Sequence, residues 1–586
     1  MMKVQLLDES TINQIAAGEV IERPASVVKE LVENSLDAGA SQVTVEVIEG
    51  GKSLIRIADN GEGMSPEDAR LALQRHATSK LRSASDLFSI KTMGFRGEAL
   101  PSIASISRLT LDTRTAASDK GLRLSLEGGK ELKEESLGSA VGTIISVSDL
   151  FYNVPARKKF LKADSTELSQ IIAVLEKMIL ANPKVRFKLT STGRIILQST
   201  GNEQLLEAVV SIYGKDIASK LLPLVLDTGP RLKIHGLVSL PTYLKNDRKG
   251  QVFFVNNRPV NDGILIKALR EGFRNTIPTN QHPYAFIFID IDPSQVDVNV
   301  HPAKLEVRFA NSQDIFSAVR SAVNNALLGS VTKASDELPE PVRSETSDST
   351  IPRSKIQNPK LSAPSWTPAM LPKWEELIST SGSKTPDTST RVPITTGSTH
   401  TAPAFQVNDS YIAAIMDGEL ALIDQHAAQE RLLFDIFSER LARQETASQQ
   451  LLVPIVLELS ARESVLLNDQ LDNLHAMGFE LSASGANSFL IRSVPVEIAQ
   501  RDPNEVLKEV LTELLEDGTG KVDRDALLKM MACKAAIKAG QRLNSSEIAA
   551  LIDDLQKHPS ARTCPHGRPT VIKLSAKELA RMFKRT

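Results

Sequence analysis

The chain has few cysteines, no leader segment and no long apolar run, and each absence narrows the class of protein. Only Cys533 and Cys564 occur among the 586 residues. That excludes a disulfide scaffold and indicates a reducing compartment, where cysteine more often binds a metal or takes part in catalysis. No apolar stretch reaches the roughly 20 residues of a membrane helix, and the first residues do not resemble a signal peptide. We therefore expect a soluble cytoplasmic protein.

An excess of charge of one sign is also missing. Lys and Arg together number 69 and Asp and Glu 71, for a formal net charge of −2. Overall charge therefore neither supports nor excludes a nucleic-acid partner, and only local basic patches could indicate one.

The apolar pattern divides the chain into folded blocks and one linker. Residues 1–210 and 211–330 alternate helical and strand-like runs, including strand-like runs at 251–255 and 285–291 and helical stretches at 264–274 and 312–328. Residues 331–403 are dense in Ser, Thr and Pro and cannot bury enough apolar surface to offset their ordering entropy, which predicts a disordered linker. The apolar pattern returns at 404–586. The prediction is a multidomain protein of α/β and α+β units.

Three short elements near the N-terminus suit a nucleotide. Pro24 and Gly39 suit the start and end of a helix on which Glu30, Asn34 and Asp37 share a face. A strand-like run at 54–58 leads into Asp59-Asn-Gly-Glu-Gly63, where two glycines allow close backbone approach. Further on, glycines at 94 and 97 precede a short helical pattern whose free N–H groups could hold phosphate. From spacing alone, a solvated polar face and a common turn remain open alternatives.

Together, in this order, these elements resemble the Bergerat ATP-binding fold of GHKL ATPases, and no Walker A sequence is present to suggest a P-loop instead. The resemblance implies that Glu30 is the general base, that Asn34 holds Mg²⁺ with ATP, and that Asp59 reads the adenine. It further implies ATP contacts from Gly61, Gly63, Thr78, Lys80, Gly94, Phe95, Arg96, Gly97, Glu98 and Thr143. The stretch His76 to Lys80 could order over the nucleotide.

Four strings narrow the resemblance to the MutL family of mismatch-repair proteins: NQIAAGEV at 13–20, ENSLDA at 33–38, DLFYNVPAR at 149–157 and DVNVHPAK at 297–304. The resemblance implies a ribosomal-S5-like second domain whose Lys304 reaches the γ-phosphate, an arm at 1–20 exchanged when ATP dimerises the heads, and a nucleoid-associated location. The expected partners are a MutS-type mismatch sensor, DNA without sequence preference and a second copy of the chain. Basic residues that could contact DNA phosphates are Arg157, Lys158, Lys159, Arg258, Lys267 and Arg270, with solvated surface as the equal alternative.

The C-terminal block contains a candidate metal site. His426 and Glu430 are four residues apart on a predicted helix that begins near Asp424, and Cys564 and His566 could chelate from one tight loop. With Ala532-Cys-Lys534, these strings resemble the endonuclease signature of nicking MutL proteins. The resemblance assigns Asp424, His426, Glu430, Cys564 and His566 to a Zn²⁺ or Mn²⁺ site, Asp424 to catalysis, and Cys533 and Asp435 to the lining.

Two residues depart from that signature. Asp435 replaces a Glu and Lys534 replaces an Arg, which loses bidentate phosphate binding. A further string, from Gln449 through Leu452 to Pro454, resembles the peptide that docks on the replication sliding clamp. An ordinary core strand explains the same residues equally well.

Three functions follow from these patterns. The first is an ATP-switched, metal-dependent nicking endonuclease in mismatch repair. The second is a non-nucleolytic matchmaker in which only the ATPase works and a separate nuclease is recruited. The third is another ATPase of the same class, such as a topoisomerase subunit or a sensor kinase, against which no phosphoacceptor domain or sensor segment is visible.

Overall fold

The computed structural model describes residues 20–75, 77–78, 97–229, 231–245, 247–274, 276–278, 280–297, 307–336, 404–443, 447–499, 501–517, 524–537, 540–558 and 561–585. Nearly all of the predicted N-terminal arm and of the predicted linker therefore lies outside the described residues. No helix within these ranges is long and apolar enough to cross a membrane.

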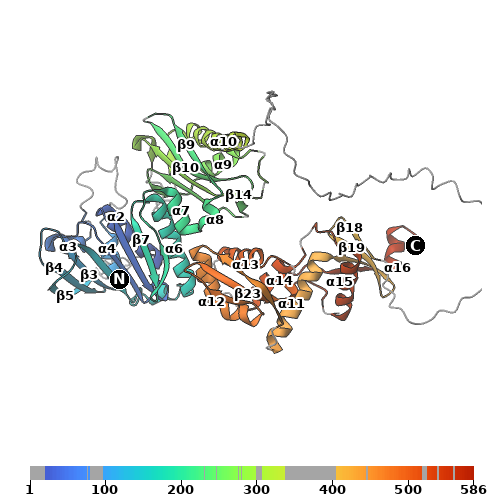
Figure 1. Ribbon diagram of the computed structural model, residues 1–586. Coiled ribbons are helices and arrows are strands. Elements are labelled where there is room, and N and C mark those ends of the chain that lie inside the picture. The colour runs from blue at the N-terminus through green and yellow to red at the C-terminus, as the bar shows by residue number, and fades with distance from the viewer. Residues whose placement is uncertain are drawn as a thin grey trace, which may run out of the picture.

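The first domain is built on an eight-stranded sheet with the order β5-β4-β3-β6-β2-β1-β7-β8 (Figure 1). Neighbouring strands are antiparallel except for the parallel pair β1 and β7. The strands are β1 Gln42–Ile48, β2 Leu54–Asp59, β3 Arg108–Arg114, β4 Gly121–Glu127, β5 Lys130–Leu137, β6 Gly142–Ser148, β7 Arg186–Ser191 and β8 Arg194–Gln198.

Helices pack on this sheet because alternate strand residues are apolar. In β1, Val43, Val45 and Val47 are at most 1% exposed, whereas the residues between them are partly exposed. Helix α2, Pro24–Asp37, contacts α4, Ala99–Ser105, and α6, Asp164–Ala181. Shorter helices are α3 Pro66–Ala72, α5 Pro155–Lys158, α7 Leu205–Tyr213 and α8 Lys215–Ala218.

The second domain has a five-stranded sheet with the order β13-β12-β15-β10-β9. The sequence predicted its central strands at 251–255 and 285–291 from continuous apolar runs. Such runs indicate that side chains on both faces of a strand are buried, and the structure agrees. Phe253 and Ile287 face a core shared with α9 and α10, whereas Phe254 and Phe286 belong to the first domain's core. The elements are β9 Leu221–Asp227, β10 Leu232–Ser239, β11 Leu244–Lys245, β12 Gln251–Val255, β13 Arg258–Val260, α9 Gly263–Gly272, β14 His282–Pro283, β15 Ala285–Ile291, β16 Val296–Asp297, β17 Arg308–Phe309 and α10 Ser312–Asp336.

Helix α10 runs past the predicted end of this domain. It continues through Gly329 to Asp336, beyond the predicted start of the linker at residue 331. A glycine inside a helix costs only about 1 kcal/mol relative to alanine, which is not enough to end a helix by itself.

The C-terminal block has two sheets, each with its own core. One sheet has the order β18-β19-β20-β24 and packs on α11 and α15; the other has the order β21-β23-β22 and packs on α12, α13 and α14. The strands are β18 Ala404–Val407, β19 Tyr411–Met416, β20 Glu419–Asp424, β21 Ser448–Glu458, β22 Glu480–Ala483, β23 Ser488–Pro495 and β24 Val571–Leu574. The helices are α11 Gln425–Arg443, α12 Ala461–Ala476, α13 Pro503–Asp517, α14 Arg524–Ala535, α15 Ser545–Lys557 and α16 Ala576–Met582.

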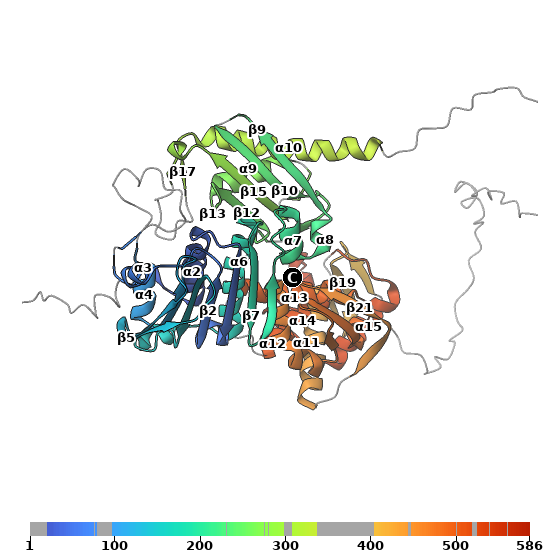
Figure 2. The same ribbon diagram turned by 60° about the vertical axis from the view of Figure 1, so that its left-hand side comes forward.

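Figures 1 and 2 both place α12 of this block beside α6 of the first domain.

Candidate functional site

Helix α2 presents the predicted polar face beside the sheet. Its apolar side is anchored in the core, with Val27 and Leu31 at most 1% exposed, while Glu30, Asn34 and Asp37 are only partly buried. Pro24 stands at the first helical position, where its missing N–H costs nothing. The Glu30 carboxylate lies 3.7 Å from the Lys29 ammonium. A carboxylate and an amide thus stand one turn apart on a rigid helix.

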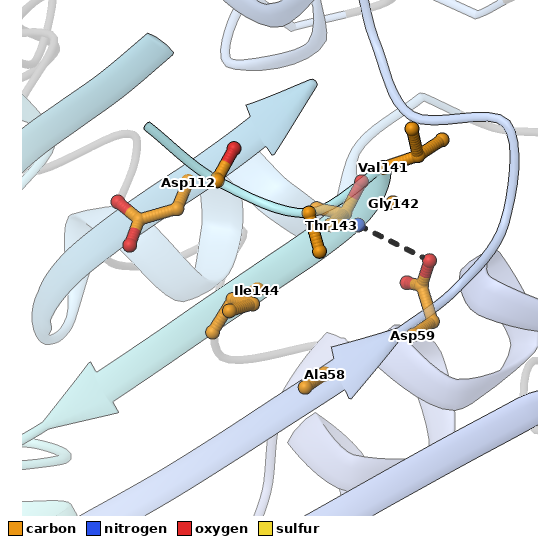
Figure 3. A pocket seen from close by; sticks show the side chains of 9 residues that line it. Ala58, Asp59, Asp112, Val141, Gly142, Thr143 and Ile144 are labelled. Carbon is orange, nitrogen blue, oxygen red and sulfur yellow. Dashed lines mark hydrogen bonds between the residues drawn. The ribbon is translucent and has the colours of Figure 1, made fainter. Parts of the chain in front are cut away.

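Asp59 is held between α2 and β6 at the end of β2. Its Oδ2 accepts a hydrogen bond of 2.8 Å from Ser35 Oγ, and its Oδ1 accepts from Gly61 N at 2.9 Å and Thr143 N at 3.2 Å. Figure 3 shows Asp59 and Thr143 facing each other across neighbouring strands. Three donors therefore fix the orientation of this carboxylate before any ligand arrives.

A small pocket of about 170 Å³ adjoins these two residues, lined by Ala58, Asp59, Asp112, Ser139, Ala140, Val141, Gly142, Thr143 and Ile144 (Figure 3). Gly142 has φ +122, and a Cβ there would lie 2.2 Å from the Asp59 carbonyl oxygen. Only glycine allows Thr143 to approach Asp59 this closely. Sequence reasoning missed the roles of two residues: Ser35, which lies inside the string at 33–38, and Gly142, which directly precedes the predicted ATP contact Thr143.

Part of the predicted phosphate region is described. Gly97 has φ +63, and a Cβ there would lie 2.4 Å from the Ala77 carbonyl oxygen, so the predicted phosphate segment meets the stretch predicted to order over the nucleotide. Thr78, Gly97 and Glu98 are partly buried. The other residues predicted for this region, Lys80, Gly94, Phe95, Arg96 and Lys304, lie outside the described residues, and Gly63 lies in the turn after β2.

The predicted DNA-contacting residues separate into two groups. The exposed group consists of Lys158, Lys159, Lys267 and Arg270. The other two arginines are partly buried: Arg157 Nη1 donates to the Ile21 carbonyl at 2.9 Å, and burial lowers the pKa of Arg258 despite the nearby carboxylates Glu33 and Asp37.

In the C-terminal block, one buried carboxylate is shared by two groups of potential metal ligands. Ligand atoms of His426, Glu430 and Cys533 lie within 4.8 Å of one another, and so do those of Glu430, Cys564 and His566. The Glu430 side chain is 2% exposed, and its Oε1 is 2.5 Å from His566 Nδ1. The close polar neighbours of this buried carboxylate are thus potential metal ligands themselves, an imidazole nitrogen and the Cys533 thiol, which suits an atom that accepts a cation.

The remaining donors also suit a cation. His426 Nδ1 lies 2.8 Å from the Ile537 carbonyl oxygen, an acceptor, so Nδ1 carries the proton and Nε2 keeps its lone pair for a metal. Cys564 and His566 come from a tight turn in which Gly567 N donates to the Cys564 carbonyl. Burial, together with Glu430, raises the pKa of Cys533 to about 11, and a bound cation would oppose this because it favours the thiolate.

Three predicted residues lie outside both ligand groups. Asp424 caps α11, because its Oδ1 accepts from His426 N at 3.1 Å and Ala427 N at 3.0 Å. Asp435 forms an ion pair with Arg431 in which two nitrogens each lie 3.0 Å from a carboxylate oxygen. Lys534 Nζ lies 2.8 Å from a Glu513 oxygen.

The predicted clamp-binding string lies on an exposed interruption of β21. The ladder with β23 shifts register between Gln450 and Ile455, and Gln449, Leu452 and Pro454 are all exposed. Leu452 is fully exposed at 104%. The sequence left a core strand open as an alternative, but the side chains of a core strand would be buried and these are exposed.

The outer face of the sheet containing β20 is apolar. Phe405, Leu422 and Ile572 occupy one row across the sheet and are 63%, 36% and 51% exposed. Alternate residues such as Ile412 and Ile423 fill the opposite, buried face. An exposed apolar row on a paired sheet is typical of a surface that binds another protein.

Three family models match the chain. "Histidine kinase-, DNA gyrase B-, and HSP90-like ATPase" matches residues 21–138. "DNA mismatch repair protein, C-terminal domain" matches 209–328, and "MutL C terminal dimerisation domain" matches 404–543.

Curated relatives match over the full length. The DNA mismatch repair protein MutL of Symbiobacterium thermophilum is 40% identical, with 100% of both chains covered. That of Syntrophotalea carbinolica is 38% identical, covering 100% of this chain and 99% of the relative. Among solved structures, the Aquifex aeolicus MutL ATPase domain complexed with ADP is 28% identical with a TM-score of 0.38, covering 51% of this chain and 98% of that one.

The first domain, with Asp59 set between α2 and β6, is an ATPase of the GHKL class. The full-length relatives narrow this class, and the chain belongs to the MutL family of DNA mismatch repair proteins. It has an N-terminal ATPase domain, a MutL transducer domain and a C-terminal domain through which it forms a homodimer. The family resemblance and the fold class predicted from the sequence are confirmed.

Proposed function

We propose that this protein couples ATP binding in its N-terminal half to metal-dependent nicking of DNA in its C-terminal half. The observation that carries the nicking proposal is the buried Glu430 carboxylate, which both groups of imidazole and thiol ligands share. A structural role alone does not require a buried carboxylate surrounded by imidazole and thiol groups at ligand distances.

The donor set favours Zn²⁺ or Mn²⁺. Thiol and imidazole ligands suit zinc, whereas carboxylate ligands are also accepted by manganese. The residues that would hold a cation are His426 and Glu430 from α11, Cys533 from α14, and Cys564 with His566. The bound cation would supply Lewis-acid chemistry for phosphodiester hydrolysis.

Asp424 has two separable roles in this proposal. Its carboxylate caps α11 and so sets the position of His426 and Glu430, and as the proposed catalytic residue it also supplies negative charge at the site. Asparagine is as good a helix cap as aspartate but carries no charge, whereas alanine does not cap.

The pair Asp424→Asn and Asp424→Ala therefore tests catalysis apart from folding. With purified protein, supercoiled plasmid and Mn²⁺, the Asn variant is expected to lose nicking while its melting temperature stays within about 2 °C of the wild type. The Ala variant is expected also to lose roughly 1 kcal/mol of stability with the cap. If the Asn variant still nicks DNA, Asp424 has no catalytic role and only caps α11. If the wild-type protein cleaves no plasmid with any divalent cation, the nicking proposal fails. The alternative, a non-nucleolytic matchmaker that recruits a separate nuclease, would then be favoured.

In the N-terminal half, we assign Glu30 to activating water, Asn34 to the Mg²⁺ that accompanies ATP, and Asp59 to the adenine. The rigid placement of Asp59 by Ser35, Gly61 and Thr143 supports this assignment, since preorganised polar groups select a ligand without reorganisation. Lys304 would contact the γ-phosphate and so make the arrangement of the two N-terminal domains depend on ATP.

The protein would act after a MutS-type sensor has recognised a mismatch and before the DNA strand is cut, and it would bind DNA without sequence preference. The exposed Lys158, Lys159, Lys267 and Arg270 are the best-placed phosphate contacts, and the partly buried Arg157 and Arg258 rank behind them.

Binding to a sliding clamp would use the exposed string in β21. Leu452→Ala is expected to weaken binding to the purified clamp roughly 10- to 30-fold, as for an apolar anchor at an interface. The fully exposed side chain makes folding independent of this change. Val456→Ala is a matched control, since Val456 is 52% exposed on the same strand outside the string. Surface plasmon resonance would measure both affinities, and equal binding by Leu452→Ala and the wild type would refute the clamp assignment.

A further inference from the structure

The first turn of α12, in the C-terminal domain, lies against α6 of the ATPase domain. Arg462 Nε donates a 3.1 Å hydrogen bond to Ser169 Oγ, across 293 positions of sequence. Ala461 and Val465 are 0% and 8% exposed and belong to the same buried apolar cluster as the ATPase core. The two figures agree on this placement. The contact therefore combines burial of apolar side chains with a specific polar pair.

The same turn of α12 also reaches the transducer domain. Glu463 and Asp216 lie close enough to Tyr243 to contribute to its pKa, which burial raises to about 12. Glu458, just before α12, lies near Gly214, where an added Cβ would be 3.8 Å from its carboxylate oxygen. The C-terminal domain thus contacts the ATPase and transducer domains at the place where they join.

A buried acid of α6 lies near Arg462 and Glu463 of α12 and near Tyr213 of α7. Glu176 of α6 is 6% exposed, and its Oε1 has no hydrogen-bond partner among the described residues. Burial raises its pKa to about 7, opposed by Arg462 and reinforced by Glu463. Lys177 on α6 and Lys245 on β11 are the other charged groups nearby.

We propose that α12 docks reversibly on the α6 face of its own chain, and that the charge on the Glu176 carboxyl limits the strength of docking. Asp336 and Ala404 belong to one chain, so the two parts that form this contact are covalently joined. Because the C-terminal domain is tethered to the ATPase domain, docking is intramolecular, and the effective concentration of α12 near α6 is high. Because α12 contacts both the ATPase domain and the transducer domain, docking favours one arrangement of these two domains. By thermodynamic reciprocity, a ligand that changes their arrangement must also change the strength of docking.

The direction of the pH effect follows from proton linkage. In the free position proposed here, Glu176 would face water with the ordinary pKa of a glutamate, roughly 4.3, whereas burial in the docked position raises its pKa to about 7. The docked form therefore binds the extra proton, and docking weakens as pH rises from about 4.3 to about 7 and then levels off. Between pH 6 and pH 8 the expected loss in the docking constant is about tenfold.

Thiol labelling of a Val465→Cys chain tests the proposal, because this side chain belongs to the buried apolar cluster of the ATPase domain. The full-length protein is treated with a thiol reagent, the labelled peptide is identified by mass spectrometry, and rates are corrected for thiolate fraction. Labelling of residue 465 is expected to be about tenfold faster at pH 8 than at pH 6. Adding Glu176→Gln, an uncharged isostere, should keep labelling slow at both pH values.

Adding Arg462→Glu should instead make labelling fast at both pH values, because a second carboxylate would face Glu176. Asp469→Ala, at an exposed position of α12, is the matched control and should behave as the parent. Equal rates in the parent and the Arg462→Glu chain, or a pH effect that survives Glu176→Gln, would overturn the proposal. Protection that increases with protein concentration would assign the contact to two copies of the chain and overturn docking within one.

Discussion

Replacing Glu430 by glutamine is expected to remove cation binding and nicking together. Glu430 is the one residue that both ligand groups share, so its loss leaves each group with two ligands. Glutamine keeps the size of the side chain but cannot neutralise a divalent cation. Mutation of residues that only hydrogen-bond to metal ligands already lowers metal affinity or activity by about 10- to 100-fold. We therefore expect nicking to fall at least roughly 100-fold and cation content, measured by elemental analysis, to fall with it.

A control on the same helix separates this effect from a general disturbance of α11. Glu439→Gln removes an exposed carboxylate that only pairs with Arg443 on the helix surface, and it should leave cation content and nicking unchanged. Nicking by Glu430→Gln at the wild-type rate would place the reaction elsewhere in the molecule.

Replacing Glu30 by glutamine is expected to abolish ATP hydrolysis while ATP still binds. Loss of a general base lowers the rate by roughly 10²- to 10⁴-fold, and the Gln side chain cannot accept the proton. Binding should change less than about threefold, since adenine recognition is assigned to Asp59, held by its own donors at the other end of the site. Phosphate release and nucleotide titration would measure the two quantities separately.

The matched control for this variant is Glu22→Gln, at an exposed position just before α2. It should hydrolyse ATP at the wild-type rate. Equal loss of ATP binding and hydrolysis in Glu30→Gln would instead make Glu30 a binding residue.

Because the two sites lie in different domains, neither variant should change the ligand chemistry of the other site, whereas nicking depends on both sites through the proposed coupling. Glu30→Gln is expected to retain its full cation content, and Glu430→Gln to retain ATP hydrolysis, as expected for distant sites that share no partner. A chain with both changes should show both losses independently.

Local sequence was sufficient for the ATPase elements because their geometry is set within a few residues. Helical periodicity placed Glu30 and Asn34 on one face of α2, and the strand before Asp59 appears as β2. Apolar runs likewise predicted β12 and β15, since a strand buried on both faces needs no polar alternation. The order of the ATPase elements indicated the GHKL class, and four short strings at 13–20, 33–38, 149–157 and 297–304 indicated the MutL family, which the full-length relatives confirm.

The sequence by itself thus determined the fold class, the family and the spacing of His426 and Glu430, all of which depend on neighbours along the chain. Only the tertiary structure decided that Glu430 joins two ligand groups and that Leu452 is exposed. These outcomes depend on segments more than 100 residues apart, or on which face of a strand meets water. Local periodicity carries no information about such contacts, because packing of the whole domain sets them.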